Sequence, residues 1–381
     1  STAVSIGILL ATFMGGLGLG SWLLPRISLP KGSNARRPLI LYALIEAGIA
    51  AFGLIELFLI PLIEQIYVVA AGYGPLGMVL RALTCVVVLL PPTTLMGASL
   101  PAIARWVRAT PRGVSWWGFL YGVNTAGAVV GCVTAGFFLM PRFNTVVATL
   151  VAVSLNALVA IVSFLAARSL PADSALESEA FPEHDIPVTK VPAASSATPI
   201  YVAVGISGAC AMGAQIIWTR NMGLMLGATV YAFSNILAAF LVGLGVGAGL
   251  GAMIARGRSP RVALGWCQIF AVFGIAWSAY NISTALPNWP IDTYYAPSQI
   301  YIFQLDFVRA LWAILPPTLI WGASVPLAFA AAARSVTKTY DSARTVGRVY
   351  ATNTLGAIVG ALAVSLVLVP YGGGPSGQRG F

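Results

Sequence analysis

Long apolar stretches, separated by short polar ones, recur along almost the whole chain. Each is about 20 residues or longer, which is enough for a helix to cross the hydrocarbon core of a bilayer. The pattern predicts ten membrane spans, over residues 2–24, 38–63, 78–107, 117–140, 143–168, 200–225, 228–255, 260–284, 303–333 and 345–370. Outer-membrane strands would show short segments of alternating polarity, and none is found. We therefore expect an all-α polytopic membrane protein.

The composition agrees with a membrane protein and excludes several other classes. Hydrophobic residues make up 58% of the chain and charged residues 8%, whereas soluble domains average about half and a quarter. The net charge of +10 could indicate a nucleic-acid partner, but the basic residues gather at span ends, where a lipid bilayer explains them. The four cysteines are scattered singly and histidine occurs once, so we expect no metal site and no cofactor.

One block of sequence occurs twice. It reads Leu-Pro-Pro-Thr, then Gly-Ala-Ser-x-Pro, and later Tyr-x-x-Asn-Thr-x-Gly-Ala. The copies cover residues 90–93, 97–101 and 121–128 in the first half, and 315–318, 322–326 and 350–357 in the second. A repeat of this length and order indicates that the protein consists of two copies of one unit.

The paired prolines of this block, Pro91 and Pro92 with Pro316 and Pro317, lie inside apolar spans. Two adjacent prolines remove backbone donors and kink a helix. Since lipid offers no water, neighbouring helices or a polar cavity must satisfy the freed carbonyls. Broken helices at matching places in two halves are typical of the central site of a transporter. The alternative is that the prolines only bend two helices for packing.

Aligning the two copies predicts the domain organisation. Nothing in the first half matches 200–225 and nothing in the second matches 143–168, so we expect a six-helix unit and a twelve-helix plan clipped at both ends. The expected parts are a first membrane repeat without its opening helix, a linker, a second membrane repeat without its closing helix, and a tail, at residues 1–168, 169–199, 200–370 and 371–381 respectively.

The distribution of lysine and arginine predicts the topology. Most of the 21 basic residues fall in loops on one side, which is then cytoplasmic. The linker lies on that side, is rich in Pro, Ser, Ala and acidic residues, and is expected to be disordered. Because six helices per unit is an even number, the halves should be parallel repeats related by an axis along the membrane normal, as in major-facilitator transporters.

Four pairs of glycines have the spacing that lets membrane helices approach closely. They are Gly16 with Gly20, Gly127 with Gly131, Gly243 with Gly247, and Gly356 with Gly360. All four are expected at helix–helix contacts.

Charged and polar side chains inside the spans are the candidates for chemistry, because burying them in lipid is costly. Glu46 and Glu56 share one span, and Gln268 takes the place of Glu46 in the other half. We expect Glu46 to face the helix interior near the proline breaks and Asn124. The pairs Tyr121 with Asn124 and Tyr350 with Asn353 could bind a substrate or hold helices together.

Three arginines lie near the ends of spans, namely Arg81, Arg220 and Arg309. Arginines at such positions usually extend toward the lipid headgroups, and we expect these three to be interfacial.

The motifs together resemble a known family. The segments 37–46 and 218–245, with the Leu-Pro-Pro-Thr and Tyr-x-x-Asn-Thr blocks, are similar to the membrane domain of fused major-facilitator/spermidine-synthase proteins. The resemblance implies a bacterial cytoplasmic-membrane protein, often joined to a soluble aminopropyltransferase-like domain. No sequence typical of that domain follows residue 370, so no catalytic residue and no enzymatic activity are assigned to this chain.

Three functions therefore remain open. The chain could bind or move a small solute, such as a polyamine, between its halves. It could instead be a structural subunit of a larger membrane complex with other membrane subunits, or the membrane platform of a polyamine-biosynthetic enzyme. Few acidic residues lie within the spans, which argues against a strongly polycation-selective path.

Overall fold

The computed structural model describes residues 2–26, 36–70, 75–108, 113–170, 196–227, 229–255, 259–289, 298–335 and 342–368. Within these ranges the protein is helical, and no strand occurs. Apolar side chains favour helices here because each helix satisfies its backbone hydrogen bonds within one segment, as lipid requires.

The helices of the first half are α1 (Thr2–Leu23), α2 (Arg36–Ala70), α3 (Pro75–Arg108), α4 (Gly113–Thr134), α5 (Met140–Arg142) and α6 (Thr145–Ser169), with a 3₁₀ turn η1 (Leu24–Arg26) and a π-helical turn η2 (Ala135–Leu139). Those of the second half are α7 (Thr198–Leu226), α8 (Val230–Ala255), α9 (Pro260–Tyr280), α10 (Gln299–Ser335) and α11 (Ser342–Ala363), with π-helical turns η3 (Asn281–Ala285) and η5 (Val364–Leu368).

Each of the ten expected spans falls on a helix. In the described part of the chain, nine helices are long and apolar enough to cross a membrane, as in a multi-pass membrane protein. The remaining one, α1, is apolar over the shorter stretch Gly7–Leu23. Most of the expected linker, and the tail, lie outside the described residues.

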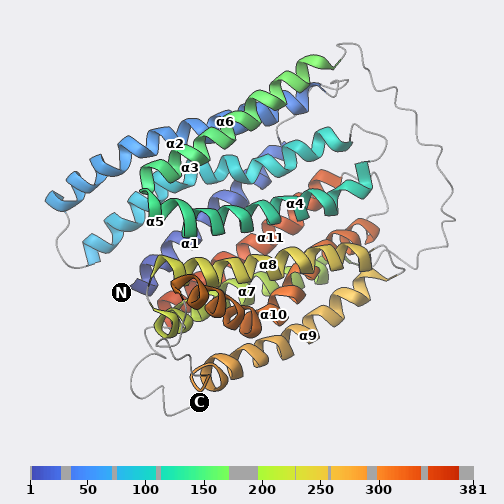
Figure 1. The fold of residues 1–381 in the computed structure, drawn as a ribbon. Helices are drawn as coiled ribbons and strands as arrows, with labels where there is room; N and C mark the ends of the chain where they lie inside the picture. The colour runs from blue at the N-terminus through green and yellow to red at the C-terminus, as the bar shows by residue number, and fades with distance from the viewer. Residues whose placement is uncertain are drawn as a thin grey trace.

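The helices run side by side, with the first half on one side of the molecule and the second on the other (Figure 1). Inside the halves the packing follows one scheme: α1 and α2 contact α3, while α8 and α9 contact α10. Between the halves, α1 packs against α11 and α8 packs against α4. The boundary therefore contains the equivalent helices α1 and α8 and the equivalent helices α4 and α11, one of each pair from each half.

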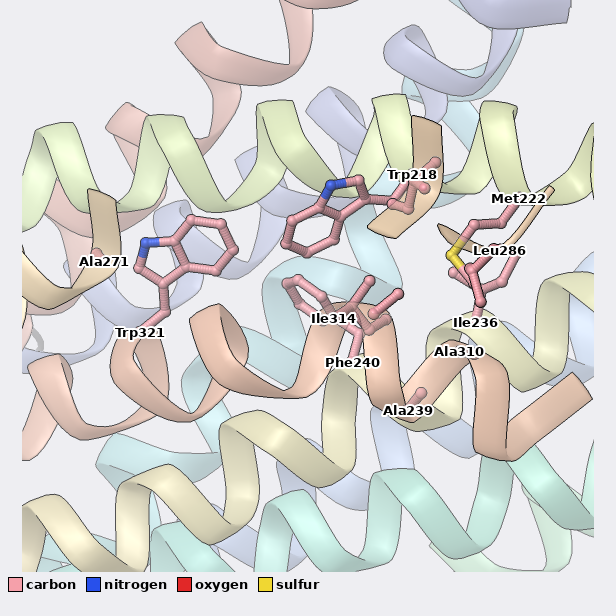
Figure 2. Close-up of a cluster of buried hydrophobic side chains, with 12 residues drawn as sticks. Trp218, Met222, Ile236, Ala239, Phe240, Ala271, Leu286, Ala310, Ile314 and Trp321 are labelled. Carbon is pink, nitrogen blue, oxygen red and sulfur yellow. The ribbon is translucent and has the colours of Figure 1, made fainter. Parts of the chain in front are cut away.

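The larger core lies in the second half. Figure 2 shows aromatic and aliphatic side chains from α7, α8, α9 and α10 meeting in one cluster. The rings of Trp218 and Trp321 lie 5.7 Å apart between centroids. In the first half, a smaller cluster joins α2 to α3 through Ile45, Ile49 and Ala98. Helix packing in lipid depends on such close contacts, since water supplies no driving force there.

Candidate functional site

The proline pair of α10 shows how the freed carbonyls are satisfied. In a helix, Pro316 and Pro317 cannot donate to the carbonyls of Trp312 and Ala313, four residues earlier. The α10 helix nevertheless continues through both prolines. The indole nitrogen of Trp277 donates to the Trp312 carbonyl at 2.9 Å, and the Ser278 hydroxyl donates to the Ala313 carbonyl at 2.7 Å. Helix α9 thus supplies both missing donors.

Replacing Ser278 with alanine should therefore destabilise the protein. The change leaves the buried Ala313 carbonyl without a partner, which costs about 1–3 kcal/mol. Thermal unfolding in detergent measures the loss, with Ser283→Ala as control. Within the described residues, the exposed Ser283 hydroxyl bonds only to carbonyls one turn earlier and to its neighbour Thr284. Equal unfolding temperatures for the two variants would contradict this role of Ser278.

The threonine after each proline pair lies against a glycine of the neighbouring helix. A methyl group built on Gly16 of α1 would overlap the side chain of Thr93, and one built on Gly243 of α8 would overlap Thr318. Thr93 donates to the Leu89 carbonyl at 2.6 Å, and Thr318 to the Ile314 carbonyl at 2.8 Å. The repeated sequence therefore forms the same contact in both halves.

The boundary between the halves contains matched pairs of small residues. Gly18 of α1 lies against Thr354 of α11, and Gly245 of α8 lies against Thr125 of α4. Thr125 and Thr354 hold the same position in the repeated Tyr-x-x-Asn-Thr block. The two contacts are thus the same contact made once from each half.

A second pair of boundary contacts joins equivalent positions, but the glycine and the serine are interchanged between the two contacts. Gly7 of α1 lies against Ser365, and Ser234 of α8 lies against Gly136. Gly136 and Ser365 belong to the π-helical turns η2 and η5, which follow α4 and α11. π-Helical turns are rare and occur frequently at functional sites. Two of them at matching places make this boundary the strongest candidate site.

One of the four glycine pairs differs from expectation. Methyl groups built on Gly356 and Gly360 of α11 would overlap the backbone of Gly205 and Ala209 of α7. On Gly127 and Gly131 of α4 they meet nothing within 4 Å among the described residues. The prediction that all four pairs lie at helix contacts is therefore wrong for α4, because no described helix covers it as α7 covers α11.

Glu46 of α2 lies at the contact with α3. Glu46 is buried, with 7% of its surface exposed, beside the cluster that joins α2 to α3. Tyr42, one turn earlier, interacts with its carboxyl group. At the matching place in α9, Gln268 donates to the Ser324 hydroxyl at 3.2 Å. Glu56 is partly buried. Glu46 and Gln268 therefore belong to contacts within each half, away from the boundary contacts described above.

The asparagine and tyrosine candidates have different surroundings in the two halves. Asn353 packs against Gly208 of α7, and Tyr350 is partly buried. Asn124 is exposed on α4, and the side chain of Tyr121 lies outside the described residues. The structure therefore does not place the two asparagines in equivalent surroundings.

Arg309 is buried inside the protein rather than extended from its surface. Its guanidinium is buried, lies 3.3 Å from the Asp306 carboxylate and donates to the Leu286 carbonyl at 3.0 Å. A carboxylate one turn away and a tight turn after α9 give the arginine nearer partners than the lipid headgroups. The spacing of Asp306 and Arg309 by three residues was the signal in the sequence.

The other two arginines predicted to be interfacial are Arg220 and Arg81. Arg220 is exposed on α7. The side chain of Arg81 lies outside the described residues. For Arg81 an interfacial position stays a prediction.

Comparison with protein-family models, with curated proteins and with solved structures found no match. The function must therefore be argued from the helices and their contacts.

Proposed function

We propose that this chain is a transporter-like membrane protein in which two parallel six-helix-type repeats, of major-facilitator kind, bind and move a small solute between them. A polyamine is the solute that the family resemblance suggests. The observation that carries the proposal is the boundary, where α1 meets α11 and α8 meets α4 through equivalent residues.

The chemistry of this boundary suits relative movement of the halves. Its closest helix contacts are made by Gly, Thr and Ser, while the larger Phe137 ring packs beside them on Tyr231 and Phe303. Small residues allow close approach of two backbones. Transporters of this class alternate access by rocking one repeat against the other around a site at the repeat interface.

Disulfide locking across the boundary tests the proposal. A Cβ atom built on Gly18 lies 3.4 Å from that of Thr354, and one built on Gly245 lies 3.6 Å from that of Thr125. Both separations are close to the range that a disulfide spans. Cysteine pairs at these positions, in a background without the four natural cysteines, should cross-link on oxidation.

Uptake of labelled spermidine into proteoliposomes is the measurement. We expect uptake above that of empty liposomes, loss of at least about 90% on oxidation as the halves can no longer rock, and recovery with a reductant. Single-cysteine variants are the matched controls. Uptake that persists in the fully cross-linked protein would refute movement at this boundary, and no uptake of any polyamine would remove the substrate assignment.

A second function is favoured by the open face of α4. In α11 the equivalent glycines are covered by α7, whereas Gly127 and Gly131 are exposed. A surface of this kind suits a membrane helix of another subunit. The chain would then be a structural component of a larger membrane complex.

Paired leucine substitutions separate this alternative from transport. Gly356→Leu should lower the stability of the isolated protein, since it collides with Gly205. Gly127→Leu should leave that stability unchanged but reduce the size of the particle extracted from native membranes. An unchanged particle size with Gly127→Leu would count against the subunit function.

A further inference from the structure

The same proline pair occurs in α3 and α10, so both halves face the same chemical problem. In the second half, α9 places Trp277 and Ser278 against the carbonyls freed by the prolines of α10. In the first half, Pro91 and Pro92 free the carbonyls of Val87 and Val88 in α3. The neighbouring helix there is α2, which packs against α3 as α9 packs against α10.

The register of α2 against α9 predicts which residue lies nearest the Val88 carbonyl. Pro38 and Pro260 open equivalent turns and both are buried. The alignment that pairs them also pairs Glu46 with Gln268, and it pairs buried Ile49 with buried Ala271. Continued along the uninterrupted helices, it puts Glu56 at the position of Ser278.

We propose that Glu56 is a proton-binding site, a neutral carboxylic acid whose hydroxyl donates to the Val88 carbonyl. Only the protonated acid can donate, because a carboxylate is purely an acceptor. An ionised Glu56 would place a charge within an apolar span, which is costly. It would also leave the Val88 carbonyl without a donor, which costs further free energy in lipid. The proton thus performs in α2 the task that the Ser278 hydroxyl performs in α9.

The charged groups around this position are few. On α3 the ionisable residues nearest to Val88 are Arg81 and Cys85, and the side chain of Arg81 lies outside the described residues. Helix α6, which also packs against α2, contains one charged residue, Arg168, near its C-terminal end. On α2 itself Glu46 and Glu64 lie more than two turns away on either side. The inference needs no transport activity and does not rest on the proposed function.

Infrared spectroscopy of the purified full chain tests the proposal. The difference spectrum of wild type minus Glu56→Gln should contain the carbonyl band of one protonated carboxylic acid per chain, shifted in D₂O. The band should persist at about pH 7, where an ordinary glutamate with a pKa of about 4.3 is ionised. Glu46→Gln is the matched control, and it should retain the Glu56 band. A difference spectrum that contains only a carboxylate band would overturn the proposal and favour an ion pair with Arg81.

Thermal unfolding tests the hydrogen bond separately. Glu56→Ser imports the side chain of the second half and should unfold within a degree or so of the wild type, whereas Glu56→Ala should unfold about 2–4 °C lower. The wild type should lose stability on raising the pH until the acid ionises, and Glu56→Ser should not. If Glu56→Ala is as stable as Glu56→Ser, or if both respond to pH as the wild type does, Glu56 does not donate to Val88.

Discussion

Replacing Arg309 with methionine should cost about 3–5 kcal/mol of stability, the loss typical of breaking a buried ion pair from one side. The change leaves the Asp306 carboxylate buried without its cation and removes the donor to the Leu286 carbonyl. Unfolding of the purified protein in detergent, by heat or by denaturant, measures the loss. Arg220→Met is the matched control, because Arg220 is exposed, and it should change little.

A double-mutant cycle separates the pair from the rest of the network. Asp306→Asn removes the uncompensated charge, so Arg309→Met in that background should cost less than in the wild type. The part that remains, about 1.5–3 kcal/mol for a bond from a charged donor, belongs to the lost hydrogen bond to the Leu286 carbonyl, which keeps the backbone N–H of Trp289. Costs that simply add would mean that the two side chains do not interact, in spite of their 3.3 Å separation.

Substitution of Gly247 by leucine should be the most damaging single change on α8. A Cβ atom at Gly247 would overlap the backbone carbonyl of Leu319, which cannot move aside as a flexible side chain could. Overpacking of this kind costs about 1–3 kcal/mol and often more when backbone must shift. Two residues further along the same helix, Gly249 has nothing within 4 Å among the described residues.

Gly249→Leu is therefore the control for Gly247→Leu, with the same helix, residue types and propensity change. We expect it to alter the unfolding temperature far less. The difference between the two variants isolates the contact of α8 with α10 from the effect of removing a helix glycine. Similar losses for both would contradict the close approach of these helices.

The amino-acid sequence by itself determined the class of the protein and the repeat. Apolar runs of membrane-spanning length predict the helices, and each expected span falls on one, because satisfaction of the backbone in lipid depends only on the segment itself. The need for outside donors at the proline pairs also followed from the sequence, since proline lacks an N–H wherever it lies. Trp277 and Ser278 meet that need in the second half.

Which side chains meet which partners was decided by the tertiary structure. Gly127 and Gly356 have the same local sequence, yet one is exposed and the other lies against α7. Arg309 resembles a residue that reaches the headgroups, but the turn after α9 and Asp306 hold it inside. The spacing of Asp306 from Arg309 is visible in the sequence, but the other deciding neighbours, α7 and the turn after α9, lie far away along the chain. Local patterns carry no information about such neighbours, whose presence decides whether a glycine packs and whether a charge is paired.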